Sequence, residues 1–325
     1  MKKITGALLF LPLLPWLAAA CSSEDPAEAS DGTGGVPSTG GVVSQTGGAS
    51  GGGLATGGAT LGTGGENLGG APGDGGTPGT GGTPENRSAG CGESTDQATG
   101  TWVQSTVNVG NGTRPFSTYL PSGYDPERAY PVILLLHGCG SGTNNLPMEQ
   151  HTGSDAILVR GTGSGADTCW SDDQDLPFID AMVDAVKERF CTNTNRFFAV
   201  GYSSGSWTAS LLSCIRADVF RGIGTVAGGE NSKPGQCGGP VARMFFNDTT
   251  DMNNKVELAR PGRDRMISQN QCTNESDPVT PSPCVSYRGC AEGYPVIWCE
   301  TAGHGHSRRD DVAAPAFWNL FKDLD

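Results

Sequence analysis

The sequence predicts an α/β fold: a doubly wound, mostly parallel sheet preceded by a disordered Gly/Thr-rich linker. After residue 91, short apolar segments alternate with longer amphipathic ones, which is the order typical of a parallel sheet with helices on its faces. Residues 132–136 form an unbroken apolar run, as expected for a strand buried on both faces. Before residue 91, glycine is too abundant for the chain to bury a core.

The predicted strands and helices divide the second part of the chain. Strands are expected at residues 101–109, 116–120, 132–136, 156–159, 196–200, 222–226, 241–246 and 295–298. Helices are expected at residues 175–189, 204–215, 257–269 and 312–321. In such sheets ligands bind at the carboxyl ends of the strands, so functional residues are sought there.

Charge and cysteine content restrict the partners and the compartment. The 325 residues carry a formal net charge of -13, which disfavours nucleic acid and anionic membrane surfaces, because both bind clustered Lys and Arg. Ten of the eleven cysteines lie from Cys91 to Cys299, an even number that suits a disulfide framework in an oxidising compartment. We expect five disulfides, with Cys272 bridged to Cys299.

Residues 1–20 have the features of an export signal. Lys2 and Lys3 precede an apolar run over residues 4–17, which is too short to span a bilayer. Three alanines then precede Cys21, and this ending resembles the lipobox of bacterial lipoproteins. The resemblance implies that Cys21 is lipidated and anchors a secreted protein to the cell envelope, facing the exterior or the periplasm. Ordinary signal cleavage, which releases the chain, is the alternative.

Residues 21–90 are predicted to form a disordered tether. Gly, Thr, Ser, Pro and Ala dominate this segment, and Thr-Gly-Gly recurs at irregular intervals, so it is a compositionally biased tract and not a structural repeat. A coil of this length spans roughly 45 Å. The folded domain is expected to occupy residues 91–325.

A candidate nucleophile lies between a predicted strand and a predicted helix. Residues 201–205 read Gly-Tyr-Ser-Ser-Gly, the G-x-S-x-G pattern of a nucleophile elbow in its strand–turn–helix setting. The glycines are needed because side chains at those positions would clash with the strand and the helix. Ser203 is therefore the predicted nucleophile, with a structural Gly/Ser turn as the alternative.

The groups that assist a serine nucleophile can also be sought. Residues 137–140 read His-Gly-Cys-Gly directly after the central strand, and we expect the Cys139 and Ser204 amides to form an oxyanion hole. The chain order Ser…Asp…His leaves His304 and His306 as candidate bases. His304 is preferred because it follows the last strand sooner.

The orienting acid is expected after the strand at residues 241–246. Asp248 and Asp251 both follow it, and either carboxylate could fix the tautomer of the histidine. The spacing alone does not choose between them.

Several motifs together resemble a family. They are residues 119–124, 130–140, 169–170, 195–205 and 298–299, and they are similar to those of extracellular esterases with the α/β-hydrolase fold. This group, which includes family-one carbohydrate esterases, contains feruloyl esterases, acetylxylan esterases and polyhydroxybutyrate depolymerases. The resemblance implies ester hydrolysis through an acyl-enzyme, without a metal or organic cofactor.

The resemblance also bears on the acid and the base. In the group the acid closes a His-Gly-x-x-Asp stretch, which maps onto residues 247–251 and nominates Asp251. Asn247 and Asp248 replace His-Gly here, so Asp248 remains a rival. The group has Gly-Gly-His before its base, whereas Ala302 precedes Gly303 and His304, which leaves His304 and His306 open.

Substrates are inferred from the tether and the aromatic residues. A tethered exported esterase suits polymeric substrates, so feruloyl or acetyl esters of plant cell-wall polysaccharide rank first and polyhydroxybutyrate second. Trp170 is expected to offer a binding face near the pocket, with Trp207 as a further candidate. Two alternatives from other classes are a non-catalytic surface-binding module and a zinc site of the C-terminal cysteines and histidines, which the absence of short C-x-x-C pairs disfavours.

Overall fold

The structure, a computed structural model, describes residues 86–140, 142–230 and 237–325. The predicted export signal, the predicted lipidation site Cys21 and the predicted tether up to residue 85 lie outside the described residues. Residues 86–90 already contact the folded domain, because Arg87 forms a β-bridge with Asn193 and the Ser88 hydroxyl donates to the Phe190 carbonyl. In the described part of the chain, no helix has both the length and the hydropathy needed to cross a membrane.

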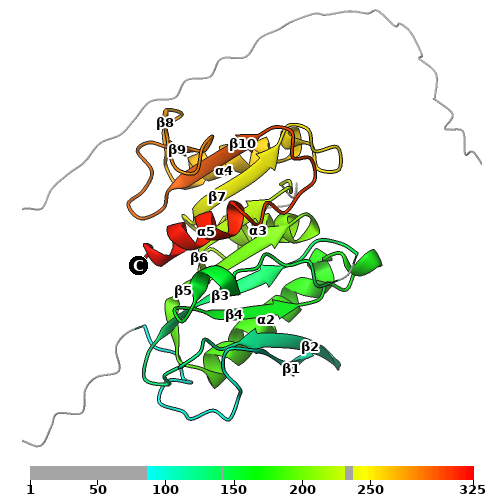
Figure 1. Ribbon diagram of the computed structural model, residues 1–325, viewed down its shortest axis with the longest axis vertical. Helices are drawn as coiled ribbons and strands as arrows, with labels where there is room; N and C mark the ends of the chain where they lie inside the picture. Colours follow the sequence, from blue (N-terminus) through cyan, green and yellow to red (C-terminus); the bar gives the residue numbers. More distant parts are fainter. Residues whose placement is uncertain (1–85, 141, 231–236) are drawn as a thin grey trace, which may run out of the picture. The chain divides into compact units, whose positions relative to one another are not determined.

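A ten-stranded sheet forms the centre of the described domain, in the order β1-β2-β4-β3-β5-β6-β7-β10-β9-β8 (Figure 1). The six central strands from β4 to β10 run parallel, whereas β1 and β2 at one edge and β8 and β9 at the other are antiparallel. The strands are Trp102–Val109 (β1), Gly112–Tyr119 (β2), Tyr130–Leu136 (β3), Ile157–Gly161 (β4), Thr192–Tyr202 (β5), Phe220–Val226 (β6), Ala242–Asp248 (β7), Ser276–Pro278 (β8), Val285–Tyr287 (β9) and Val296–Thr301 (β10).

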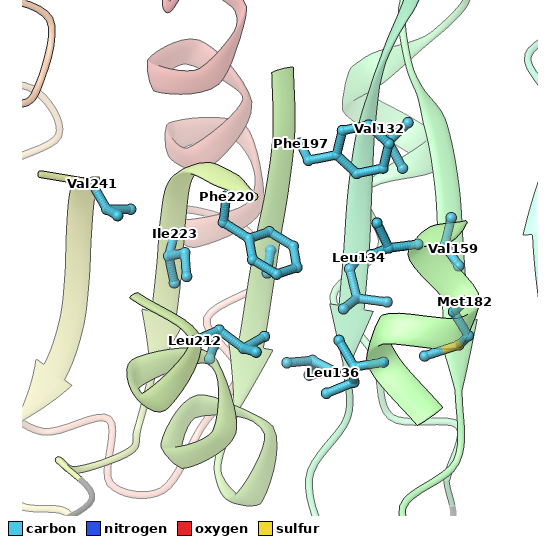
Figure 2. Packing of buried hydrophobic residues seen from close by; sticks show 14 of the residues in the cluster. Val132, Leu134, Leu136, Val159, Met182, Phe197, Leu212, Phe220, Ile223 and Val241 are labelled. Carbon is cyan, nitrogen blue, oxygen red and sulfur yellow. The ribbon is translucent and has the colours of Figure 1, made fainter. Parts of the chain in front are cut away.

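Helices cover both faces of the sheet. They are Glu149–Thr152 (α1), Asp172–Arg189 (α2), Ser204–Ile215 (α3), Arg260–Gln269 (α4) and Ala313–Lys322 (α5), with short 3₁₀ turns at Ala166–Thr168 and Val256–Leu258. Strand β3 shows how the layers arise: Val132, Leu134 and Leu136 belong to a buried cluster with residues of α2 and α3 such as Met182 and Leu212 (Figure 2). Ile133 and Leu135 belong to a second cluster that includes residues of α5, because successive side chains of a strand alternate between faces.

The predicted fold class is confirmed. Each predicted strand and helix is present, with ends shifted by a few residues, except that the helix expected at residues 257–269 is divided into a 3₁₀ turn and α4. Pro261 lies in the first turn of α4, where its fixed φ and missing N–H are tolerated, so the regular helix begins there. The sequence did not predict the β8–β9 hairpin, whose three-residue strands are not buried and carry no core-facing alternation.

The ten cysteines of the described domain form five disulfides, as expected: Cys91–Cys191, Cys139–Cys169, Cys214–Cys237, Cys272–Cys290 and Cys284–Cys299. The predicted Cys272–Cys299 pair is wrong. Val285 of β9 pairs with Trp298 of the antiparallel β10, and this register brings Cys284 beside Cys299. The framework indicates an oxidising, extracellular type of compartment.

Candidate active site

The turn between β5 and α3 presents Ser203 at the carboxyl edge of the sheet. Ser203 has φ 53° and ψ −118°, a strained conformation that costs of order 1–3 kcal/mol and is concentrated at functional sites. Both flanking glycines are required: a Cβ on Gly201 would lie 2.2 Å from the Gly205 carbonyl oxygen, and one on Gly205 would lie 2.1 Å from the Leu136 carbonyl oxygen. The pattern thus forms the tight elbow that the sequence predicted.

Three side chains from separate segments form a hydrogen-bonded chain at this turn. Ser203 Oγ lies 2.9 Å from His306 Nε2, and His306 Nδ1 lies 2.8 Å from Asp251 Oδ2. Asp251 is buried, and its Oδ1 accepts hydrogen bonds from the Asn253 and Asn254 amides at 2.8 and 2.9 Å. With Nδ1 donating to the carboxylate, Nε2 is left to accept the serine proton, which is the arrangement of a Ser-His-Asp triad.

The expectation that His304 contacts the nucleophile is wrong; the structure brings His306 to Ser203 instead. His304 is exposed, and its backbone amide donates to Asp248 Oδ2 at 3.2 Å. The chain turns back only after Gly303 and Gly305, whose φ angles of 85° and 58° lie in the left-handed region that glycine adopts readily. The shape of this turn, and not the distance from β10, decides which histidine reaches the serine.

Asp248 anchors the loop that carries His306. Its Oδ1 accepts from the backbone and hydroxyl of Thr250 and from the Gly305 amide, and its Oδ2 accepts from the Thr301 hydroxyl and the His304 amide. Burial alone would raise the pKa of Asp248, but these hydrogen bonds outweigh it and hold the pKa well below its usual range. The rival carboxylate is therefore an ionised loop anchor that does not contact the histidine ring.

The loop after β3 lies against the nucleophile. A Cβ added to Gly138 would lie only 3.1 Å from the Ser203 Cβ. The backbone of the loop at Gly138 is therefore close to the nucleophile. The buried His137 ring has Nδ1 2.6 Å from the Gly138 carbonyl, and its Nε2 accepts from the Gly163 amide at 3.1 Å. In a trans peptide the C=O and N–H point in opposite directions, so the bond to His137 turns the Cys139 N–H away from that ring.

Acidification is expected to destabilise the domain through His137. Burial lowers its pKa, although the bond to Gly138 and the charge of Asp175 oppose this. The stability associated with the neutral ring is present above the unfolded pKa of about 6.5 and is lost as pH falls through the folded pKa. Thermal unfolding should be measured above pH 6.5 and again well below it. The unfolding midpoint should fall further on acidification for wild type than for His137→Gln; equal falls would contradict the prediction.

Trp170 is not the open stacking surface that the sequence suggested. Its side chain is 8% exposed, its Nε1 donates to the His137 carbonyl at 3.0 Å, and its backbone amide donates to Ser204 Oγ at 2.8 Å. It therefore supports residues 137–140, the expected oxyanion loop. Trp207 is fixed by a 3.0 Å bond from Nε1 to Asn254 Oδ1, which links α3 to the loop of Asp251.

Removal of the Cys139–Cys169 disulfide is expected to lower kcat. This bridge ties the oxyanion loop to the segment of Trp170, so its loss loosens the Cys139 amide. The matched control is Cys272–Cys290, which joins the end of α4 to the β8–β9 hairpin. Sequence separations of 30 and 18 residues give chain-entropy contributions that differ by only about 0.5 kcal/mol. The double variants in which both cysteines of a bridge are replaced by alanine should lose similar free energy of unfolding. Only the variant without Cys139–Cys169 should lose turnover; equal losses of kcat would refute a specific role of that bridge in catalysis.

The zinc alternative is contradicted by the disulfides, because Cys272, Cys284, Cys290 and Cys299 are all bonded to other cysteines. Among the described residues, no group of three or more His, Cys, Asp or Glu side chains could hold a metal ion.

Sequence reasoning missed the amides of Asn253 and Asn254, which fix the acid, and Tyr202, whose hydroxyl donates to the His306 carbonyl at 3.2 Å. Tyr202 occupies a variable position of the elbow motif, so no pattern marked it.

Comparison with known proteins agrees with this architecture, although no family model matches the chain. Feruloyl esterase D of Neurospora crassa is 29% identical over 265 residues, 72% of this chain and 89% of that protein. A poly(3-hydroxybutyrate) depolymerase of Ralstonia pickettii is 29% identical over 166 residues, 43% of this chain and 33% of that protein. The acetyl xylan esterase structure from Aspergillus awamori superposes with a TM-score of 0.55 at 12% identity, over 69% of this chain and 99% of that one. In sequence the chain thus resembles feruloyl esterases and, over a shorter segment, a polyhydroxybutyrate depolymerase, and it shares the α/β-hydrolase fold of the acetyl xylan esterase.

Proposed function

We propose that this protein is a serine esterase that hydrolyses carboxylic esters through an acyl-enzyme. The observation that carries the proposal is the hydrogen-bonded chain from Ser203 through His306 to Asp251. A non-catalytic binding module would have no need for a strained serine aligned with a histidine and a buried carboxylate. Similarity to feruloyl esterase D over most of its length supports the same reaction class.

Each residue has a defined role in this mechanism. His306 Nε2 accepts the Ser203 proton as Oγ attacks the ester carbonyl, and Asp251 stabilises the imidazolium that forms. The amides of Cys139 and Ser204 donate to the oxyanion. His306 then protonates the leaving alcohol, and the acyl-enzyme is hydrolysed by a water molecule that the same histidine activates.

The proposed substrates are feruloyl or acetyl esters of plant cell-wall polysaccharide. The support is the similarity to feruloyl esterase D, which covers 89% of that protein, whereas the match to the depolymerase covers 33% of its length. Depolymerisation of polyhydroxybutyrate is the second candidate, on the strength of that partial match. We further propose that the enzyme acts outside the cytoplasm on a lipid anchor at Cys21, which the signal pattern and the disulfide framework support.

The test is a hydrolysis panel of p-nitrophenyl acetate, methyl ferulate, acetylated xylan and a polyhydroxybutyrate suspension. Wild-type protein should release ferulate or acetate and leave the suspension turbid. Clearing of the suspension, with no ferulate released from methyl ferulate and no acetate released from acetylated xylan, would favour the depolymerase function instead. Turnover of none of the four would refute the esterase assignment.

A further inference from the structure

A polar cavity of about 540 Å³ lies beside the histidine of the active site. His306 and Tyr202 line it together with Asn144 and residues 307–311. All of these residues have polar or charged side chains: Ser307, Arg308, Arg309, Asp310 and Asp311 complete the wall. The cavity therefore favours a ligand that can form several hydrogen bonds.

We propose that this cavity binds the alcohol portion of the ester and selects a hydroxyl-rich alcohol such as a sugar. The inference rests on the proposed esterase mechanism, in which His306 protonates the leaving oxygen. Because general acid catalysis requires hydrogen-bond contact between the two groups, the leaving alcohol must lie against His306. The cavity lined by His306 adjoins the position that the leaving alcohol must occupy.

The wall of the cavity presents donors and acceptors side by side. Arg308 Nη2 lies 2.5 Å from Asp310 Oδ2, and Arg309 Nε lies 3.7 Å from Asp311 Oδ1. The side chains of Arg308 and Asp310 are 32% and 35% exposed, so part of each faces the cavity, although Asp310 Oδ1 itself is buried and has no hydrogen-bond partner. Neighbouring sugar hydroxyls can donate to a carboxylate and accept from a guanidinium at once, and the paired charges suit a neutral ligand.

Arg308 is fixed at a junction of two loops. Its Nη1 donates to the Asn145 carbonyl at 3.1 Å, which ties the segment after His306 to the segment after the oxyanion loop. Tyr202 adds an aromatic ring 5.3 Å from the His306 ring, a surface on which the apolar face of a sugar can pack. The pocket is therefore held in shape from several sides.

A polyester chain fits this wall poorly. Its internal repeats offer ester oxygens, which accept hydrogen bonds, and apolar groups, but no hydroxyl that could donate to Asp310. An apolar cavity of about 580 Å³ does exist in the domain, lined by residues such as Pro281, Ile297 and Leu320, but no residue of the triad lines it. The chemistry beside His306 favours the sugar ester.

The experiment compares two substrates with the same acyl group, methyl ferulate and a feruloylated arabinose. In Asp310→Ala and Arg308→Gln, kcat/KM for the arabinose ester should fall about tenfold more than for methyl ferulate, mainly through KM, as expected for loss of one hydrogen bond to a charged group. Asp310→Asn keeps the shape of the side chain and an acceptor oxygen for a sugar hydroxyl, so its ratio should lie between those of wild type and Asp310→Ala, which separates lost binding from a disturbed loop.

The control pair is Arg288 and Asp277, an ion pair on the β8–β9 hairpin that is exposed and does not line the cavity. Arg288→Gln and Asp277→Ala should leave the ratio of the two specificity constants at the wild-type value. If the cavity variants lose activity on both substrates equally, this inference fails while the esterase assignment stands. If wild type hydrolyses neither feruloyl ester, this inference fails for feruloyl substrates; the esterase assignment fails only if p-nitrophenyl acetate, acetylated xylan and polyhydroxybutyrate are not turned over either.

Discussion

His306→Ala is expected to lower kcat by on the order of a million-fold, as much as Ser203→Ala, because serine and histidine of a triad act as one unit. His306 Nε2 is the base that lies 2.9 Å from Ser203 Oγ, and without it the hydroxyl is a weak nucleophile. The double variant should be no slower than either single one. Stopped assays with p-nitrophenyl acetate, on proteins whose unfolding midpoints match wild type, would measure these losses.

The matched control is His304→Ala, two residues away in the same loop. The His304 side chain is exposed, and substitutions at such positions change free energies by only about 0.5 kcal/mol. Turnover should stay within a few-fold of wild type, since that energy corresponds to about a factor of two. A large loss for His304→Ala with full activity in His306→Ala would overturn the triad described here.

The fold and the nucleophile could be predicted because both depend on local patterns. An unbroken apolar run such as residues 132–136 is typical of a central strand that is covered on both faces. The structure shows β3 buried throughout. The elbow is marked by a local pattern, and a side chain at Gly201 would clash within the turn itself. A side chain at Gly205 would instead clash with the Leu136 carbonyl of β3, a contact between distant segments that the G-x-S-x-G pattern implies without showing the partner.

The base and the disulfide pairing depended on contacts between distant segments. His306 reaches Ser203 because Asp248, over fifty residues earlier, binds the His304 and Gly305 amides and shapes the loop. Cys299 pairs with Cys284 because a hairpin of two short strands, neither of them buried, adds to β10. Neither the carboxylate contacts nor a three-residue strand that is not buried produces a periodic signal in the sequence.

Asp251→Asn is expected to lower kcat by about ten-thousand-fold, as replacement of the orienting acid does in an enzyme with the same triad. Asp251 Oδ2 lies 2.8 Å from His306 Nδ1, and an amide there can present its NH₂ group and favour the wrong tautomer. The two backbone amides on Oδ1 should keep the loop in place, so stability should fall little. The low-field NMR signal of a proton shared between Nδ1 and the carboxylate should disappear.

Asp248→Asn should show the opposite balance of effects. Its carboxylate accepts hydrogen bonds from Thr250, Thr301 and the Gly305 amide. In Asp248→Asn the side-chain NH₂ would face some of these donors, which should cost about 2–3 kcal/mol of unfolding free energy. Because the wild-type pKa is held below its usual range, this stability is present above the unfolded pKa of about 3.9 and is lost as pH falls through the folded pKa. Displacement of His306 by about 1 Å would cost roughly a hundredfold in kcat, while the low-field proton persists. A greater kcat loss for Asp248→Asn than for Asp251→Asn, with the low-field proton lost only in the former, would assign the orienting role to Asp248.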